Sequence, residues 1–147
     1  MVLKEVKNHS DYQGLKKLSI HGPVFLLKHS ITSQVSVKAL EDFNKFNEAY
    51  AAAPCFVLMT QNFRALSDKI VADTELAHES PQVIVFLKGK PIWNADHAKV
   101  NFFKLEEVLK VHATNIDVEQ TDLNEFETFE SDLNENLSEE SEDSKNI

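Results

Sequence analysis

Two side chains of this chain are candidate nucleophiles, and they stand in different surroundings. Ser33 lies in a polar stretch, 30–36, that follows the apolar run 24–27 and opens a helical pattern. Cys55, the only cysteine among 147 residues, follows Pro54 and precedes a second apolar run. Thiol–disulfide exchange requires a thiolate, and a serine hydroxyl is far too weakly acidic to replace one. We therefore expect Ser33 to cap a helix, either as a plain cap or within a non-reactive ligand cradle.

Neither side chain has the neighbours that a more reactive role requires. His29 precedes Ser33 by four residues, but no acidic residue is placed to orient it, so a serine-hydrolase triad is not indicated. Nothing cationic adjoins Cys55 and no helix is expected to begin there, so its thiol is expected to be buried and inert. A thiol-exchange site at Cys55 is the alternative. The histidines lack the spacing of metal ligands, and no metal site is expected.

A second polar segment, 77–82, precedes the apolar run 83–87. Pro81 cannot donate a hydrogen bond to a sheet, so we expect it at the entry to a strand. The Ser80–Pro81 bond is a candidate cis peptide, because only X-Pro bonds reach the cis form at low cost. The sequence alone leaves the isomer open.

The elements that position these segments alternate along residues 1–116. Apolar spacing with Pro and Gly breaks predicts helices, and continuous apolar runs predict strands. Their order, helix-strand-helix-strand-helix-strand-strand-helix, together with Pro81, indicates an α/β, thioredoxin-like fold with a mixed four-stranded sheet flanked by helices. The helices are expected at about 10–18 (with Ser10 as N-cap), 37–50, 63–73 and 101–112, and the strands at 24–27, 56–59, 81–87 and, at an edge, 91–93.

Several short motifs occur in order over about residues 10–112. Segment 28–36 reads Lys-His-Ser-Ile-Thr-Ser-Gln-Val-Ser, and segment 78–82 reads His-Glu-Ser-Pro-Gln. The first resembles the Lys-His-Ser-x-Thr-Cys-Pro-Ile-Ser motif of the YtxJ-type monothiol bacilliredoxins, and the second resembles a later landmark of that family. Segments 64–67 and 89–97 are similar to two further landmarks. Ser33 and Gln34 stand where the family motif has Cys and Pro.

The resemblance implies a thioredoxin-like domain that removes bacillithiol from protein mixed disulfides, with the motif cysteine as nucleophile. In such a domain the helix-opening loop and the proline face each other, so the resemblance implies a ligand groove formed by Thr32, Ser33, Gln34, Ser80 and Pro81.

Because Ser33 replaces the nucleophile, we expect a redox-inactive binding or regulatory protein. Its partners would be thiol-modified client proteins, with bacillithiol as a thiol ligand and no cofactor. The alternatives are an active oxidoreductase that uses Cys55, and a scaffold that carries the acidic C-terminal segment.

Charge divides the chain after its last predicted helix. Residues 117–147 hold twelve Asp or Glu and one Lys, a net charge of −11, whereas residues 1–116 have a net charge of +2. We expect one domain over 1–114 and a disordered, acidic low-complexity tail over 115–147. Apolar residues interrupt the acids at spacings that would line one helical face, formed on a protein partner or on the domain's own lysines: Leu123, Phe126, Leu133 and Leu137.

Composition and hydropathy bear on where the protein is located and on which classes of partner it binds. The N-terminus lacks the apolar segment of a secretion signal, and no apolar run approaches the roughly 18 residues of a membrane span. Residues 1–116 show no basic stripe with aromatic platforms of the kind that binds nucleic acid. We therefore expect a cytoplasmic protein with neither membrane nor nucleic-acid partners.

Overall fold

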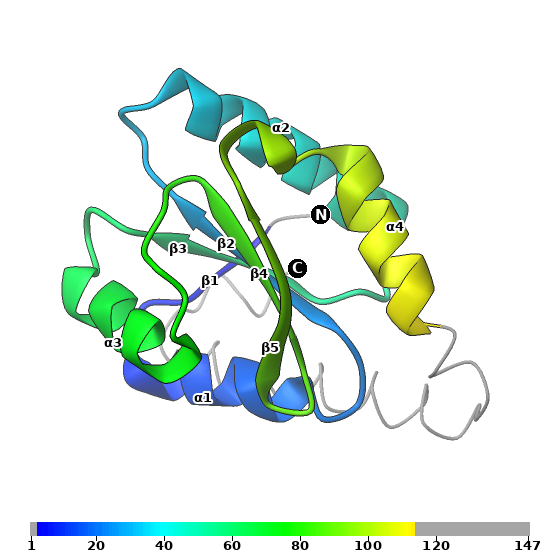
Figure 1. The fold of residues 1–147 in the computed structure, drawn as a ribbon, viewed down its shortest axis with the longest axis horizontal. Coiled ribbons are helices and arrows are strands. Elements are labelled where there is room, and N and C mark those ends of the chain that lie inside the picture. Colours follow the sequence, from blue (N-terminus) through cyan, green and yellow to red (C-terminus); the bar gives the residue numbers. More distant parts are fainter. Residues whose placement is uncertain (1–2, 114–147) are drawn as a thin grey trace, which may run out of the picture.

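The computed structural model describes residues 3–113, which form a sheet between two layers of helices (Figure 1). The sheet has five strands in the order β1-β3-β2-β4-β5. Strand β2 pairs in parallel with β3 and antiparallel with β4, so the sheet is mixed. The strands are β1 (Lys4–Glu5), β2 (Val24–His29), β3 (Cys55–Met59), β4 (Gln82–Leu87) and β5 (Lys90–Asp96); the helices are α1 (His9–Leu18), α2 (Gln34–Ala49), α3 (Arg64–Thr74) and α4 (Phe102–Ala113), with a short 3-10 turn, η1 (His97–Lys99), before α4.

The predicted α/β architecture is confirmed, but the prediction of four strands is wrong by one. The four expected strands are β2 to β5, with β5 at an edge as predicted. The fifth, β1, lies at the opposite edge beside β3, where Lys4 is opposite Phe56 and the Val6 amide donates to the Val57 carbonyl at 2.9 Å. Because β1 has only two residues, both charged, it carries no apolar alternation for a sequence pattern to detect.

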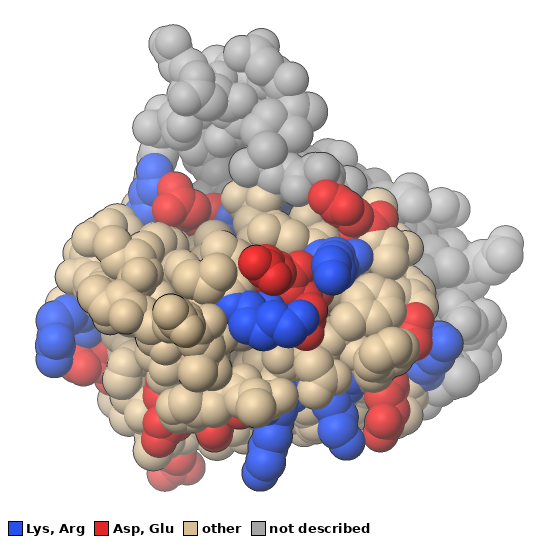
Figure 2. Space-filling view, turned by 90° about the horizontal axis from the view of Figure 1, so that it is seen from above, with Lys and Arg blue, Asp and Glu red and all other residues tan. Residues whose placement is uncertain are grey.

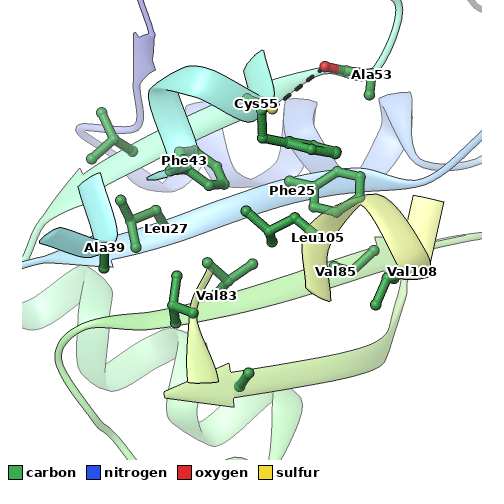
Figure 3. Packing of buried hydrophobic residues seen from close by; sticks show 14 residues of the cluster. Phe25, Leu27, Ala39, Phe43, Ala53, Cys55, Val83, Val85, Leu105 and Val108 are labelled. Carbon is green, nitrogen blue, oxygen red and sulfur yellow. Dashed lines mark hydrogen bonds between the residues drawn. The ribbon is translucent and has the colours of Figure 1, made fainter. Parts of the chain in front are cut away.

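The central strand β2 supplies both halves of the core. Val24 and Leu26 face α1 and α3, whereas Phe25 and Leu27 face α2 and α4. All six residues of β2 are buried, as a strand covered on both faces requires. Figure 3 shows the half beneath α2 and α4, in which Phe25, Phe43 and Leu105 lie close together.

Helix α1 begins earlier than predicted. Its N-cap is Asn8, whose side-chain oxygen accepts a hydrogen bond from the Asp11 amide at 2.8 Å, and not Ser10. Both residue types are good caps, so spacing alone does not choose between them. Asp73 of α3 then ties the two helices together, because it accepts hydrogen bonds from the Tyr12 hydroxyl at 2.5 Å and the Lys16 ammonium at 2.8 Å.

Within residues 3–113 no helix combines the length and the apolar character needed to cross a bilayer. The acidic tail predicted over 115–147, and the domain boundary predicted at 114, lie outside the described residues.

Replacing Phe46 by Ala should lower the free energy of unfolding by about 3–5 kcal/mol, because it empties a fully buried site beneath α2. The Phe46 ring packs on Phe25 with centroids 4.7 Å apart. Phe103→Ala is the matched control: this side chain is 76% exposed, so its loss should cost less than about 0.5 kcal/mol. Urea unfolding of both variants measures the difference, and equal losses would contradict this core.

Candidate functional site

Ser33 is the N-cap of α2. Its backbone is extended (φ −117°, ψ 131°), and its hydroxyl oxygen accepts a hydrogen bond from the Ser36 amide at 3.4 Å. The predicted capping role is therefore present in the structure. Thr32 and Gln34, on either side, are exposed. No acidic residue lies in the first turn of α2, so the positive end of the helix dipole is not neutralised there.

The loop before α2 is held to the neighbouring strand. The Ile31 amide donates to the Gln61 side-chain oxygen at 3.0 Å. One residue pair deeper, the His29 carbonyl accepts hydrogen bonds from both the amide (3.0 Å) and the hydroxyl (3.2 Å) of Thr60. These three bonds join the end of β2 to the end of β3 and fix the start of the loop that carries Ser33.

Ser80 and Pro81 enter β4 at the same end of the sheet. Their peptide bond is cis. Lys28 is opposite Gln82 in the antiparallel β2–β4 register, so the residues that follow β2 and those that precede β4 lie at the same end of the strands. The Pro81 carbonyl accepts a hydrogen bond from the His97 amide at 3.0 Å, which ties this edge to the end of β5. The structure thus places the five predicted groove residues on two segments at a common edge.

A buried lysine lies directly behind the segment that contains Pro81. Lys28 is fully buried, and its ammonium donates to the Gln82 side-chain oxygen at 3.2 Å. That oxygen also accepts the Glu79 amide at 3.4 Å, while the Gln82 side-chain nitrogen donates to the Ala77 carbonyl at 3.3 Å. Gln82 therefore fastens the segment 77–82 to itself and to β2.

Burial changes the titration of the groups on β2. Desolvation lowers the pKa of Lys28 to about 8, against the opposing attraction of Asp68 and Glu79. Desolvation also lowers the pKa of His29, partly offset by the Ser36 backbone, so its imidazole is neutral at pH 7. The pKa of His78 is lowered by burial and then by Lys28; its Nδ1 lies 3.2 Å from the Ser67 hydroxyl. At neutral pH the buried positive charge at this edge is carried by Lys28.

Unpartnered polar atoms gather at the same end of the sheet. Among the described residues, the buried side-chain atoms that lack a hydrogen-bond partner are His29 Nδ1, Ser36 Oγ and Ser80 Oγ. All three belong to the end of β2, the first turn of α2 or the entry to β4. Because buried polar atoms are normally paired, their concentration here marks a region that is incompletely satisfied by its own chain.

The surface around Ser33 is uncharged. Figure 2 looks onto the α2 side and shows a broad area without charged side chains toward the start of this helix. Residues 30–37 contain no charged residue, and three apolar side chains there are exposed: Ile31 (66%), Val35 (43%) and Val37 (47%). An apolar, uncharged surface of this kind suits contact with another protein.

Cys55 lies at the other end of the sheet. It is opposite Phe25 at the beginning of β2, whereas Ser33 follows the end of β2. Its side chain is 5% exposed, and its thiol donates to the Ala53 carbonyl at 3.5 Å (Figure 3). The expected burial is confirmed, and the structure does not bring Cys55 to the predicted groove.

No cluster of three or more His, Cys, Asp or Glu in residues 3–113 is arranged to hold a metal ion. Sequence reasoning did not single out Lys28 or Gln61 as site residues. The signal for Lys28 was its place directly after four apolar residues of a central strand; Gln61 had none, because its role depends on a loop contact.

Both the sequence and the fold are similar to those of known proteins, and many solved structures share the fold. A family model for monothiol bacilliredoxin BrxC matches residues 4–105. A solved thioredoxin-fold protein, described as a candidate oxidoreductase, is 33% identical with a TM-score of 0.66, over 72% of this chain and 92% of that one. The thioredoxin of Fasciola hepatica (10% identical, TM-score 0.64, 75% and 99% covered) and that of Schistosoma mansoni (16%, 0.62, 76% and 99%) share the fold. The predicted thioredoxin-like fold is confirmed, and the comparisons support a thiol–disulfide redox role.

Replacing Lys28 by Met should remove a distinctive pH dependence of stability. Between about pH 8, the pKa in the folded protein, and pH 10.5, the ordinary value, the unfolded chain binds more protons at Lys28 than the folded one. Wild-type stability should therefore rise relative to Lys28→Met through this window, by at most about 3 kcal/mol, and the difference should be flat below it.

Denaturant unfolding of both proteins between pH 6.5 and about 10 measures this difference. The exposed Lys17→Met variant serves as control and should follow the wild type at every pH. A wild-type minus Lys28→Met difference that does not change with pH would contradict the burial of a charged lysine.

Proposed function

The chain belongs to the monothiol bacilliredoxin family, and on this premise we propose that it is a redox-inactive member that binds thiol-modified proteins without exchanging thiols. The observation that carries the proposal is where Ser33 and Cys55 lie in the fold. A hydroxyl caps α2 at the position where the sequence resemblance places the motif cysteine, and the single thiol of the chain is buried at the far end of the sheet.

The missing step is a chemical one. Exchange begins when a thiolate attacks a disulfide sulfur and releases another thiolate. Ser33 has no accessible ionised form at neutral pH, and an alkoxide does not exchange with disulfides. Its oxygen instead accepts a hydrogen bond from the Ser36 amide, so a neutral group caps one amide of the helix start and leaves the positive end of the dipole without a compensating charge.

The surroundings of Ser33 keep features that suit binding. The free positive end of the α2 dipole and the buried ammonium of Lys28 both favour a ligand with negative character near this edge. The exposed Ile31, Val35 and Val37 offer apolar contact to the protein that carries such a ligand. A bacillithiol adduct on a client protein combines a small polar ligand with a protein surface, and we propose this class as the target. We also place the protein in the cytoplasm.

Replacing Ser33 by Cys should create exchange activity, because a thiol at a helix N-terminus has a lowered pKa. The wild type should not release bacillithiol from a bacillithiolated client protein, whereas the Ser33→Cys variant should form a mixed disulfide with bacillithiol and release it from the client. The pKa of the new thiol should lie at least about one unit below that of an ordinary cysteine.

The control is Ser30→Cys, which places a thiol in the same loop but not at the helix cap. Its thiol should be less ionised and slower at the same pH. Alkylation rates across pH and intact-mass analysis distinguish the variants. If Ser33→Cys gains nothing over Ser30→Cys, the groove has been closed by Gln34 or other changes, and the binding proposal fails.

The alternative function, exchange through Cys55, makes an opposite prediction about the native wild type. Because Cys55 is 5% exposed, incubation with oxidised bacillithiol should give no adduct on the folded protein and a stoichiometric adduct after unfolding. Intact mass with peptide mapping measures both states. A native adduct at Cys55 that a second thiol discharges would establish the oxidoreductase and end the redox-inactive proposal.

A further inference from the structure

A hollow of about 390 Å³ lies between the start of α1 and the start of α3, on the face away from α2. We call it the basic hollow. Four of its lining residues carry basic side chains and none carries a carboxylate: Lys7, His9, Arg64 and Lys69 line it together with Asn8, Asn62, Phe63, Ala65 and Leu66. Its volume is at the low end of the range for ligand pockets, enough for one or two side chains.

The positive charge of the basic hollow is only partly neutralised by its neighbours. The Lys7 ammonium lies 3.6 Å from the Glu5 carboxylate, and both side chains are about half exposed. Arg64 and Lys69 are exposed and form no ion pair among residues 3–113. Asp73, the carboxylate one turn beyond Lys69, already accepts hydrogen bonds from Tyr12 and Lys16.

The start of α3 adds to the positive character of the hollow, and the floor of the hollow is apolar. The N-cap of α3, Phe63, provides no side-chain hydrogen bond, and the first turn of α3 contains no acidic residue, whereas α1 and α2 are capped by Asn8 and Ser33. Phe63 and Leu66 pack against the core cluster of α1 and α3, so the floor is apolar. The hollow thus combines an apolar floor with a cationic rim.

The C-terminal tail has the complementary pattern. Segment 125–130 reads Glu-Phe-Glu-Thr-Phe-Glu, in which Phe126 lies between two glutamates and Phe129 precedes a third, within a tail of net charge −11. Eleven residues, 114–124, join Ala113 to this segment. Fully extended, the twelve steps from Ala113 to Glu125 span about 40 Å, about three times the radius of gyration of about 13 Å for a domain of this size, so the segment can reach the opposite face of the domain.

We propose that tail segment 125–130 docks in the basic hollow of its own chain, with Phe126 on the apolar floor and Glu125 and Glu127 beside Arg64 and Lys69. A tethered segment has an effective concentration in the millimolar range, so it occupies such a site in preference to a free acidic peptide of similar affinity. This docking is independent of the exchange chemistry at Ser33, and either proposal stands if the other fails.

The test compares amide NMR spectra of two full-length tail variants with the wild type. Glu125→Gln, Phe126→Ser and Glu127→Gln together should move the signals of Arg64, Ala65 and Leu66 at the hollow. The matched control removes the same charge elsewhere in the tail, by Glu139→Gln and Glu140→Gln, and should leave these signals in place. The signal of Trp93, on the edge strand β5, reports that the fold is retained.

Ionic strength and charge-reversal variants test whether ion pairs hold the segment in the hollow. Raising the ionic strength should shift the wild-type hollow signals toward those of the first variant, because ion pairs at an exposed rim are screened. Arg64→Glu with Lys69→Glu should abolish the difference between wild-type and variant tails, and adding Glu125→Lys with Glu127→Lys should restore it. Hollow signals that ignore the 125–127 changes would overturn the proposal. Shifts that depend on protein concentration would overturn it too, since the occupant would then be the tail of a second copy.

Discussion

The pairing of β2 with two different neighbours organises this molecule. Its parallel partner, β3, carries the loop that braces Ile31 through Gln61, and its antiparallel partner, β4, brings Ser80 and Pro81 to the same edge. The segment that leaves β2 and the segment that enters β4 therefore lie at the same end of the sheet, although about 50 residues separate them in the sequence. The helices on both faces depend on the same strand, because its alternate residues fill both halves of the core.

Lys28 places a charged group inside the packed core. A fully buried ammonium is costly unless it is hydrogen-bonded, and here it is bonded to a neutral amide, Gln82, which in turn holds the segment around Glu79. The arrangement keeps a cation behind the segment that contains Pro81, while residues 30–37 carry no charge. A ligand of the kind proposed above would contact exposed apolar side chains with this buried cation beneath them.

The sequence predicted most of the fold, because apolar runs and helical spacing with Pro and Gly breaks mark eight elements clearly. It missed β1, because two charged residues carry no apolar alternation, and it chose Ser10 over Asn8, which caps equally well. For the candidate site, segment similarity pointed to Ser33 and Pro81, and the structure places both at the same end of the sheet. The burial of Lys28 and the bond from Ile31 to Gln61 depend on tertiary contacts, and a lysine is ordinarily expected at the surface.

The serine cap of α2 also determines how this edge meets oxidants. A cysteine at such a position can be converted to sulfenic, sulfinic and sulfonic acids, each with a different charge and shape. A hydroxyl has no such series, so the edge keeps one chemical form in reducing and in oxidising surroundings. The reduction potential of the compartment would then change how much mixed-disulfide ligand is present, but not the affinity of this end of the sheet for it.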